Sequence, residues 1–290
     1  MSITKYEAFI KTVEEGSLTK AAESLGYTQS GMSHLIRSLE EELGATLLLR
    51  ERSGVRLTPE GTALLPFFRN ICNGQRELLD KANQLHGLES GLIRIGTFSS
   101  ISCHWLPAWI QSFQKQHPNI EFRLLHGDYT EIEDWLVEGR IDLGFLRLPA
   151  LANVAATTLK QDRLLVILPE AHPLAKVATF PVERLAEEPF ILLEEGKDNE
   201  IHRIFEALHL MPQVIFEVSD DYTIMAMVES GLGISILPEL VLYRNSYRIV
   251  MKELSTPFYR RLGVAVKQWG QEPLAARRFL EHISQAIPEL

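Results

Sequence analysis

The sequence predicts an α+β chain of several domains: a small helical domain with a two-stranded wing, a long linker helix, and a larger α/β domain. Three observations carry this prediction. The first sixty residues hold three capped amphipathic patterns, an apolar seam at helical steps follows Pro59, and strand-like runs alternate with helical patterns from Leu92 onward. With 290 residues, 46% of them hydrophobic, the chain is long enough for two units with buried cores.

Composition argues against several classes of protein. The 29 Lys and Arg residues stand against 38 Asp and Glu residues, a formal charge of −9, which by itself speaks mildly against a nucleic-acid partner. Cys72 and Cys103 are too few for a disulfide framework, and the start of the chain lacks the apolar core of a signal peptide, so we expect a cytoplasmic protein. Because no apolar run reaches about 18 residues, we expect no membrane partner.

Three helices are predicted in the first domain. The first runs from Thr4 to Glu15, and Ser17 can cap a second, because its hydroxyl can accept from the free backbone amides. Thr28 offers the cap of a third helix, which runs from Gln29 to Leu43. Two capped helices joined by a turn that contains Gly have the outline of a helix-turn-helix. The buried stripe of the second helix is predicted to be Leu18, Ala21, Ala22 and Leu25.

The third helix has two unlike faces when its residues are placed at helical spacing. Its core face is Met32, Leu35, Ile36 and Leu39. The opposite face is polar without acids, and Gln and Arg on it can bind the edges of adenine and guanine. The residues predicted to meet DNA there are Gln29, Ser30, Ser33, His34 and Arg37. The ordinary alternative is the solvated face of any amphipathic helix.

A small hairpin follows the third helix. Short strand-like runs at Leu47–Arg50 and Val55–Leu57 are separated by Ser53 and Gly54. The hairpin carries Arg50, Arg52 and Arg56, a winged arrangement suited to phosphate contacts.

A long helix is predicted to begin at Pro59, where Thr58 supplies a cap and Glu60 an acid in the first turn. Apolar residues then recur at alternating steps of four and three, as in a coiled-coil seam. The seam is Leu64, Phe68, Ile71, Gln75, Leu78, Ala82 and Leu85. The alternative to pairing with a second subunit is packing on its own domain. Pro66 inside this helix predicts a kink, since proline removes a backbone hydrogen bond.

The remaining residues predict an alternation of strands and helices, and hence βαβ units with mainly parallel sheets. Candidate strands lie at 92–98, 120–125, 141–146, 164–168, 190–193, 214–218 and 262–266. Helical patterns lie at about 104–116, 130–138, 200–209, 221–230 and 273–286.

Five blocks of the first domain resemble the LysR-type transcriptional regulators in residue identity and in spacing. They are Ser17–Leu25, Gln29–Ser33, Leu39–Gly44, Arg50 and Leu57–Gly61. Two phrases of the larger domain, Leu168–Ala175 and Glu229–Pro238, match the effector domain of the same family. The resemblance implies a winged helix-turn-helix DNA-binding domain at 1–60 and a linker or dimerisation helix at 58–88. It further implies a two-lobed, periplasmic-binding-protein-like effector domain at 91–290, with subdomain I at 91–162 and 266–290 and subdomain II at 163–265.

An effector site is expected beyond the carboxyl ends of the strands. The first strand of the larger domain is followed by Ser99, Ser100 and Ser102, which could cradle an anion or simply cap a helix. The resemblance adds Thr130 and Arg147. Arg147 could pair with a carboxylate effector, or equally form a salt bridge between subdomains. The acids Glu194, Glu195, Asp198 and Glu200 could line the cleft and favour a partly cationic effector, although a solvated loop is the commoner explanation of such a run.

The resemblance predicts a sequence-specific transcriptional regulator whose activity is modulated by a small molecule bound between the two lobes. Its expected partners are double-stranded operator DNA, a second copy of itself as dimer or tetramer through the linker helix, and RNA polymerase. No cofactor, metal or catalytic residue is expected, since the histidines lack metal-ligand spacing and no nucleophile has an adjacent base. The effector's identity stays open. The alternatives are a ligand-binding protein of transport and a DNA-binding protein that has lost its effector site.

Overall fold

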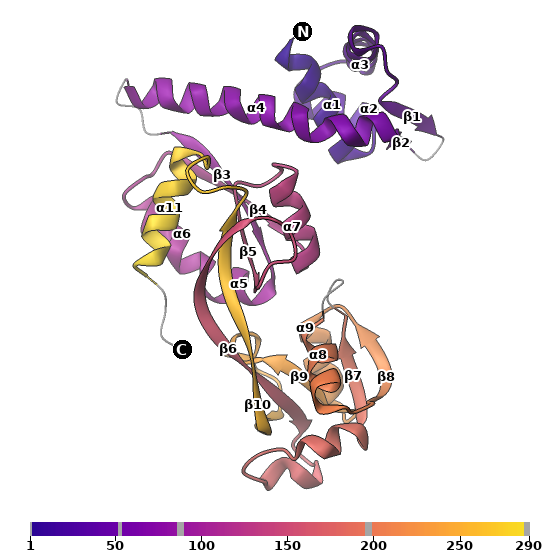
Figure 1. Cartoon of the computed structure of the whole chain (residues 1–290), viewed down its shortest axis with the longest axis vertical. Coiled ribbons are helices and arrows are strands. Elements are labelled where there is room, and N and C mark those ends of the chain that lie inside the picture. Colours follow the sequence, from indigo (N-terminus) through magenta and orange to yellow (C-terminus); the bar gives the residue numbers. More distant parts are fainter. Residues whose placement is uncertain (1, 52–53, 86–89, 195–198, 287–290) are drawn as a thin grey trace. The chain divides into compact units, whose positions relative to one another are not determined.

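The computed structural model describes residues 2–51, 54–85, 90–194 and 199–286 (Figure 1). The chain divides into two compact units: Met1–Gly91 with Val137–Arg140, and Leu92–Leu136 with Ile141–Leu290. We call them the N-terminal unit and the C-terminal unit and describe each by itself.

The N-terminal unit begins with the three predicted helices. They are α1 (Ile3–Glu15), α2 (Leu18–Leu25) and α3 (Gln29–Leu43). Ser17 caps α2 by accepting from the Lys20 amide at 3.4 Å, and Thr28 caps α3 by accepting from the Gly31 amide at 3.1 Å. The predicted cap residues therefore set the starts of both helices.

The core of this unit joins α1–α3 to the first turns of the following long helix. Phe9, Met32 and Leu39 have no exposed surface, and Ile36 is 1% exposed. One predicted core residue is wrong: Leu25 is 37% exposed. It is the last residue of α2, and since the chain turns at Gly26, no further helical turn covers it.

The wing is a two-stranded antiparallel hairpin, β1 (Leu48–Glu51) and β2 (Gly54–Leu57). The amide of Val55 donates to the carbonyl oxygen of Gly16 at 3.0 Å, which fastens β2 to the turn between α1 and α2. Gly54 has φ 137°, and a Cβ there would lie 2.4 Å from the same Gly16 oxygen. The hairpin can approach this turn only because position 54 is glycine.

The linker helix α4 (Pro59–Leu85) starts where predicted and runs uninterrupted through Pro66. The Thr58 hydroxyl accepts from the Gly61 amide at 2.9 Å and caps it. The predicted seam is wrong in its first half, because Leu64 and Phe68 pack into the core of the N-terminal unit and are not available to a second subunit. In the part of α4 whose side chains the structure describes, the large apolar residues left exposed are Phe67 (62%), Ile71 (45%), Leu78 (69%) and Leu79 (55%), which we call the α4 stripe.

The C-terminal unit has a six-stranded sheet in the order β4-β3-β5-β10-β6-β9 and a two-stranded sheet β7-β8. The strands are β3 (Gly91–Thr97), β4 (Ile120–His126), β5 (Leu143–Leu148), β6 (Ala155–Pro169), β7 (Pro189–Leu193), β8 (Gln213–Val218), β9 (Ser235–Pro238) and β10 (Ile249–Val266). The helices are α5 (Ser99–His104), α6 (Leu106–Gln114), α7 (Tyr129–Val137), α8 (Glu200–Leu208), α9 (Asp221–Glu229), α10 (Glu239–Leu242) and α11 (Leu274–Ser284), with short 3₁₀ turns at Pro173–Lys176 and Val182–Ala186.

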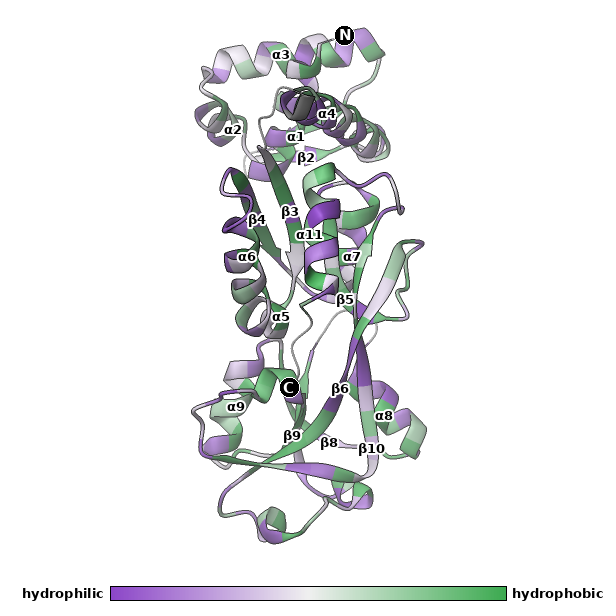
Figure 2. Ribbon diagram, turned by 90° about the vertical axis from the view of Figure 1, so that its left-hand side faces the viewer, coloured by the Kyte–Doolittle hydropathy of each residue, from purple (hydrophilic) through white to green (hydrophobic). Residues whose placement is uncertain are grey.

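Two long strands, β6 and β10, run side by side through the whole unit (Figure 1, Figure 2). At one end β10 pairs with β5, and at the other end β6 pairs with β9. The expectation of mainly parallel sheets is therefore confirmed only in part. Parallel pairing joins β3 to β5 and β7 to β8, but the pairs made by β6 and β10 are antiparallel. Sequence patterns located only the apolar stretches of these two strands.

One predicted helix is divided. The pattern at about 104–116 forms α5 and α6, with α6 starting at Leu106. Pro107 lies in the first turn of α6, where its missing N–H is tolerated, whereas inside a continuous helix it would break a hydrogen bond. The short β9 and α10 were not predicted.

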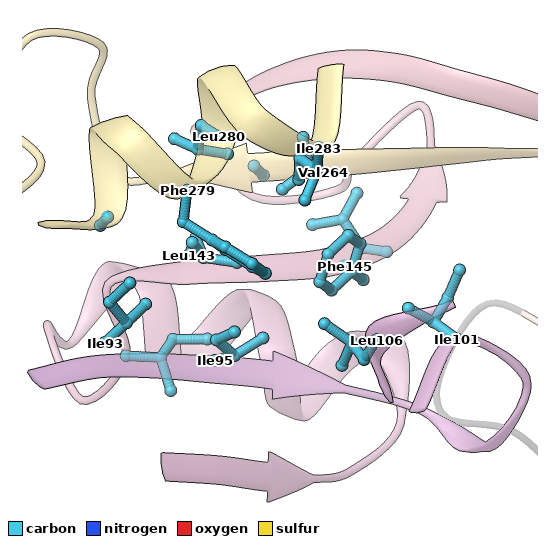
Figure 3. Close-up of a cluster of buried hydrophobic side chains, with 14 of the residues drawn as sticks. Ile93, Ile95, Ile101, Leu106, Leu143, Phe145, Val264, Phe279, Leu280 and Ile283 are labelled. Carbon is cyan, nitrogen blue, oxygen red and sulfur yellow. The ribbon is translucent and has the colours of Figure 1, made fainter. Parts of the chain in front are cut away.

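The C-terminal unit holds two lobes with separate cores. The first lobe (β3–β5, α5–α7 and α11) has its core between the sheet and its helices, with Ile95, Phe145 and Phe279 fully buried (Figure 3). In the second lobe (β7–β9 and α8–α10), Val166 of β6 faces one apolar cluster and Ile167 faces another. Burial of both faces explains the continuous apolar run that predicted this strand. The exact bounds predicted for the two subdomains stay a prediction.

Candidate functional site

The outer face of α3 is exposed as predicted. Gln29, Ser30, His34 and Arg37 are exposed and Ser33 is partly buried, while Met32, Ile36 and Leu39 lie in the core. The acids of this helix are Glu40, Glu41 and Glu42 at its C-terminal end, away from this face. Glu40 accepts from the backbone amides of Leu47 and Leu48 at 2.7 and 3.2 Å. The exposed face therefore offers amide, hydroxyl, imidazole and guanidinium groups without a carboxylate.

Within the described residues of the wing, Arg50 contacts this face. Nη2 of Arg50 donates to Oγ of Ser33 at 2.8 Å, a contact that the sequence pattern did not reveal. Arg56 is strongly exposed, with its guanidinium 3.5 Å from a Glu51 carboxylate oxygen. Arg52, the third predicted wing residue, lies outside the described residues. Two of the three wing arginines are thus placed, and Arg50 is joined to α3.

A pocket of about 270 Å³ lies between the two lobes of the C-terminal unit. The first lobe contributes residues from the end of β3 into α5 and from the end of β4 into α7, and the second lobe contributes residues at the end of β7, after β7 and β8, and from α9 and α10. Arg260 of β10 completes it. Its lining is Phe98, Ser99, Ser100, His126, Gly127, Asp128, Glu131, Leu193, Glu194, Ser219, Asp221, Val241 and Arg260.

The structure brings only part of the predicted effector set to this pocket. Ser99 and Ser100 line it, whereas Ser102 and Thr130 are not among the lining residues. The Ser102 hydroxyl donates to the Ser99 carbonyl oxygen at 3.1 Å, which is helix-internal bonding. Of the acidic run, Glu194 lines the pocket, and Glu195 and Asp198 lie outside the described residues.

Arg147 does not line the pocket either. Its Nε lies 3.4 Å from Oε1 of Glu200, and both side chains are buried. Because Arg147 belongs to β5 of the first lobe and Glu200 begins α8 of the second, the contact is the salt bridge between lobes that was the alternative to effector binding. Burial raises the pKa of Glu200 against the opposing effect of Arg260 and Arg147.

Sequence reasoning missed Arg260, the most connected side chain at the pocket. Its guanidinium donates to Oδ2 of Asp162 at 2.9 Å, to the hydroxyl of Tyr129 at 2.8 Å and to the hydroxyl of Ser100 at 2.9 Å. Arg260 is 3% exposed and Asp162 is 1% exposed. Asp162 also accepts from the Leu240 amide at 3.1 Å. This cluster ties the crossing strands to both lobes at the pocket floor.

Asp221 is the lining carboxylate with the most perturbed acidity. It is the first residue of α9, and its neighbour Asp220 is the cap that accepts from the Thr223 amide at 2.7 Å. The pKa of Asp221 is raised to about 6, chiefly by burial; Arg260 and His126 lower it, and the neighbouring Asp220 raises it.

Other chemistry has little support in the described part of the chain. It holds no group of three or more His, Cys, Asp or Glu side chains that could bind a metal ion. None of its helices combines the length and apolar character needed to cross a membrane. The Cys72 thiol has its pKa raised to about 11 by burial, which disfavours the reactive thiolate at neutral pH.

The comparisons with known proteins cover both units. Residues 3–62 match the model of bacterial regulatory helix-turn-helix proteins of the lysR family, and residues 86–288 match the LysR substrate binding domain. The transcriptional regulator YvbU of Bacillus subtilis is 33% identical over 284 residues, which is 97% of both chains.

Two solved structures extend the likeness. BenM, known from Acinetobacter baylyi, has a full-length crystal structure that is 28% identical, with a TM-score of 0.62 over 99% of this chain and 96% of that one. A full-length OxyR from Pseudomonas aeruginosa, at 23% identity, shares the fold with a TM-score of 0.76 over 99% and 94% of the two chains. The two family models and the relatives that span nearly the whole chain establish that this protein belongs to the LysR family of transcriptional regulators, with an N-terminal helix-turn-helix for DNA and a C-terminal domain that binds effector ligands.

Proposed function

We propose that the protein recognises operator DNA through α3 and the wing, acts as a self-associated molecule, and is modulated by a small molecule held in the pocket between the lobes. The observation that carries the proposal is the exposed, acid-free polar face of α3. In this proposal Gln29, Ser30, His34 and Arg37 meet base edges in the major groove, and Arg50, Arg52 and Arg56 meet phosphates. Ser33 lies on the same face of α3, and its hydroxyl accepts from Arg50 and positions that arginine.

A gel shift with duplex DNA from upstream of the protein's own gene or the neighbouring gene tests DNA recognition. The wild-type protein should still bind and shift this duplex in the presence of excess random DNA. Gln29→Ala should lower the ratio of operator to random affinity about tenfold, because one bidentate base contact is worth about 1–3 kcal/mol. An unchanged ratio in this variant would contradict the assignment of the α3 face.

The α4 stripe supports self-association. Phe67, Ile71 and Leu78 follow one another at steps of four and seven along the helix, so they share one face, and each is at least 45% exposed. Pairing two copies would remove this apolar surface from water and would present two recognition helices to two half-sites.

Sedimentation of the purified protein tests this pairing. Leu78→Lys should shift the protein toward a slower-sedimenting species. The matched control Thr62→Lys, at an exposed polar position on another face of the same helix, should not. Sedimentation of the wild type also separates a dimer from a tetramer. If Leu78→Lys sediments like the wild type, the stripe is not the interface.

The pocket supports the effector role because its lining comes from both lobes, so a bound ligand can contact both at once. A ligand that contacts both lobes favours the arrangement in which both sets of contacts are made, and the protein's population shifts toward it. Thermal-shift screening with metabolites tests this step, since a ligand bound only by the folded protein raises its melting midpoint. A protein without an effector site would respond to no metabolite in such a screen.

A further inference from the structure

The charge of the pocket between the lobes is strongly one-sided. Four of its described lining residues are acids, namely Asp128, Glu131, Glu194 and Asp221. Against them stand one arginine, Arg260, and one histidine, His126. A ligand that enters this pocket therefore meets more carboxylates than cationic groups.

The arginine of the pocket already forms hydrogen bonds and an ion pair within the protein. Arg260 gives its guanidinium N–H groups to Asp162, Tyr129 and Ser100. An anionic ligand would have to compete with the buried Asp162 carboxylate, whose nearest oxygen lies 2.7 Å from the guanidinium Nη2. The Ser100 hydroxyl is one of the acceptors of Arg260, and α5 has only 6 residues, so its N-terminus offers little field to an anion.

The four acids differ in whether their carboxylates already form hydrogen bonds or ion pairs. Asp128 and Glu131 form a reciprocal capping pair at the start of α7, in which Glu131 Oε2 accepts from the Asp128 amide at 3.0 Å and Asp128 Oδ1 accepts from the Glu131 amide at 2.8 Å. Asp221 is different. Within the described residues, its partly buried carboxylate lines the cavity and has neither a hydrogen bond nor an ion pair.

On the basis of the proposed effector role, we propose that the pocket takes a small organic cation, a protonated amine or a guanidinium compound, whose charged group binds the Asp221 carboxylate. The described lining supplies no metal-binding cluster, which favours an organic cation over a metal ion. Phe98, Leu193 and Val241 form apolar walls for the body of the ligand. The volume of about 270 Å³ lies at the small end of the range for ligand sites, about 300–1,000 Å³, and limits that body to a compact metabolite.

Binding of such a cation should depend on pH. Burial holds the pKa of Asp221 at about 6, so the carboxylate loses its charge as pH falls below that value, and the cation should then bind more weakly. The charged and titratable groups around it are Asp220 at the cap of α9, His126 at the end of β4, Asp128 after β4, Glu131 on α7, Glu194 after β7 and Arg260 on β10. His126 lines the same pocket, so a variant of Asp221 is needed to isolate the contribution of the carboxylate.

Matched probes on the full-length protein test the inference. The first set is benzylamine, benzyl alcohol and benzoate; the second is 1,4-diaminobutane, butane-1,4-diol and butanedioate, all at up to about 10 mM. The amines should raise the melting midpoint, and the alcohols and acids of equal size should raise it less. In Asp221→Asn the affinity for the best amine should fall at least tenfold, and its dependence on pH between 5 and 7 should flatten. Asp134→Asn, at an exposed position of α7 away from the pocket, is the matched control and should bind as the wild type does.

Three results would overturn the cation assignment: larger shifts with benzoate or butanedioate, no shift with any amine, or amine binding that Asp221→Asn leaves unchanged. The same preparations are tested in the gel shift described above. Loss of operator binding by the wild type would contradict the proposed function itself. Operator binding together with a preference for the acids would overturn only the cation assignment.

Discussion

The outer face of α3 and the pocket between the lobes are built in opposite ways. The α3 face comes from one short stretch of one helix, Gln29 to Arg37, and the side chains on it are mostly exposed. The pocket draws its lining from separate segments between Phe98 and Arg260, and its central ions are buried. The comparison teaches that an exposed face can change its chemistry without disturbing the fold, whereas the pocket's charges also hold the lobes together. Substitutions on the α3 face should therefore change DNA binding, whereas substitutions of the pocket's buried charges should change stability.

The largest expected effect is on the stability of the C-terminal unit. Arg260→Ala leaves Asp162 buried without its counterion, and removal of one partner of a buried pair costs about 3–5 kcal/mol. Urea unfolding followed by tryptophan fluorescence measures the loss, because all four tryptophans of the chain lie in the C-terminal unit. The matched control Arg123→Ala, at an exposed position of β4, should stay within about 0.5 kcal/mol of the wild type. Equal stability of the two variants would mean that the cluster does not hold the lobes.

This contrast also explains what the sequence could predict. The α3 face, its core residues and both helix caps follow from local spacing and local hydrogen bonding, so periodicity was sufficient. Arg260 and Asp162 are 98 positions apart, and nothing local distinguishes a buried charged residue in a strand from an exposed one. Arg147 was singled out, but its partner Glu200 comes from the other lobe, so the choice between effector and salt bridge needed the topology.

The prediction for the linker helix was correct for part of its apolar seam and wrong for the rest. The steps of four and three are present in the sequence, but two overlapping registers satisfy them. Leu64 and Phe68 belong to the register that packs on the N-terminal core, while Phe67, Ile71 and Leu78 belong to the register left exposed. A single chain cannot reveal which register its own domain covers, because that depends on how α1 packs against α4.

The next effect is on DNA recognition and should leave stability unchanged. Arg37→Ala removes an exposed guanidinium from α3 and should cost about 1–3 kcal/mol of operator affinity, with lower discrimination against random DNA. Arg56→Ala on the wing should weaken operator and random DNA alike and reduce the slope of affinity against salt by about one unit. Titration of both duplexes at several salt concentrations separates the two behaviours. If the two variants lose discrimination equally, the division into base-reading helix and phosphate-binding wing is wrong.

A smaller effect concerns the pH dependence of stability at the pocket: a pKa shift from 3.8 to about 6 corresponds to about 3 kcal/mol at most, and solvent screening of this partly exposed carboxylate lowers it. The pKa of Asp221 is raised from 3.8 to about 6 in the folded protein, so between these values the folded state binds more protons than the unfolded state. The contribution of Asp221 to stability is therefore favourable below about pH 4 and is lost as pH rises through 6. Asp221→Asn should gain stability relative to the wild type over this window and keep a constant advantage above it. Urea unfolding of both proteins at pH 4, 5, 6 and 7 measures the difference. If Asp221→Asn loses stability relative to the wild type as pH rises, the predicted sign is wrong.

The smallest effect distinguishes two roles for Ser33, which lies at the contact between helix and wing. Its hydroxyl accepts from Arg50 at 2.8 Å, so it can position the wing, and it also lies on the predicted base-reading face. If it only positions Arg50, Ser33→Ala loses one exposed hydrogen bond, worth about 0.5 kcal/mol, and operator and random DNA weaken together by less than threefold. If it reads a base, discrimination falls while random binding is unchanged. We expect the first result, because a hydroxyl already paired with Arg50 must give up that bond to reach a base edge. Competition gel shifts of Ser33→Ala beside Arg50→Ala measure both ratios, and a selective loss of operator binding in Ser33→Ala alone would return Ser33 to the set of base-reading residues.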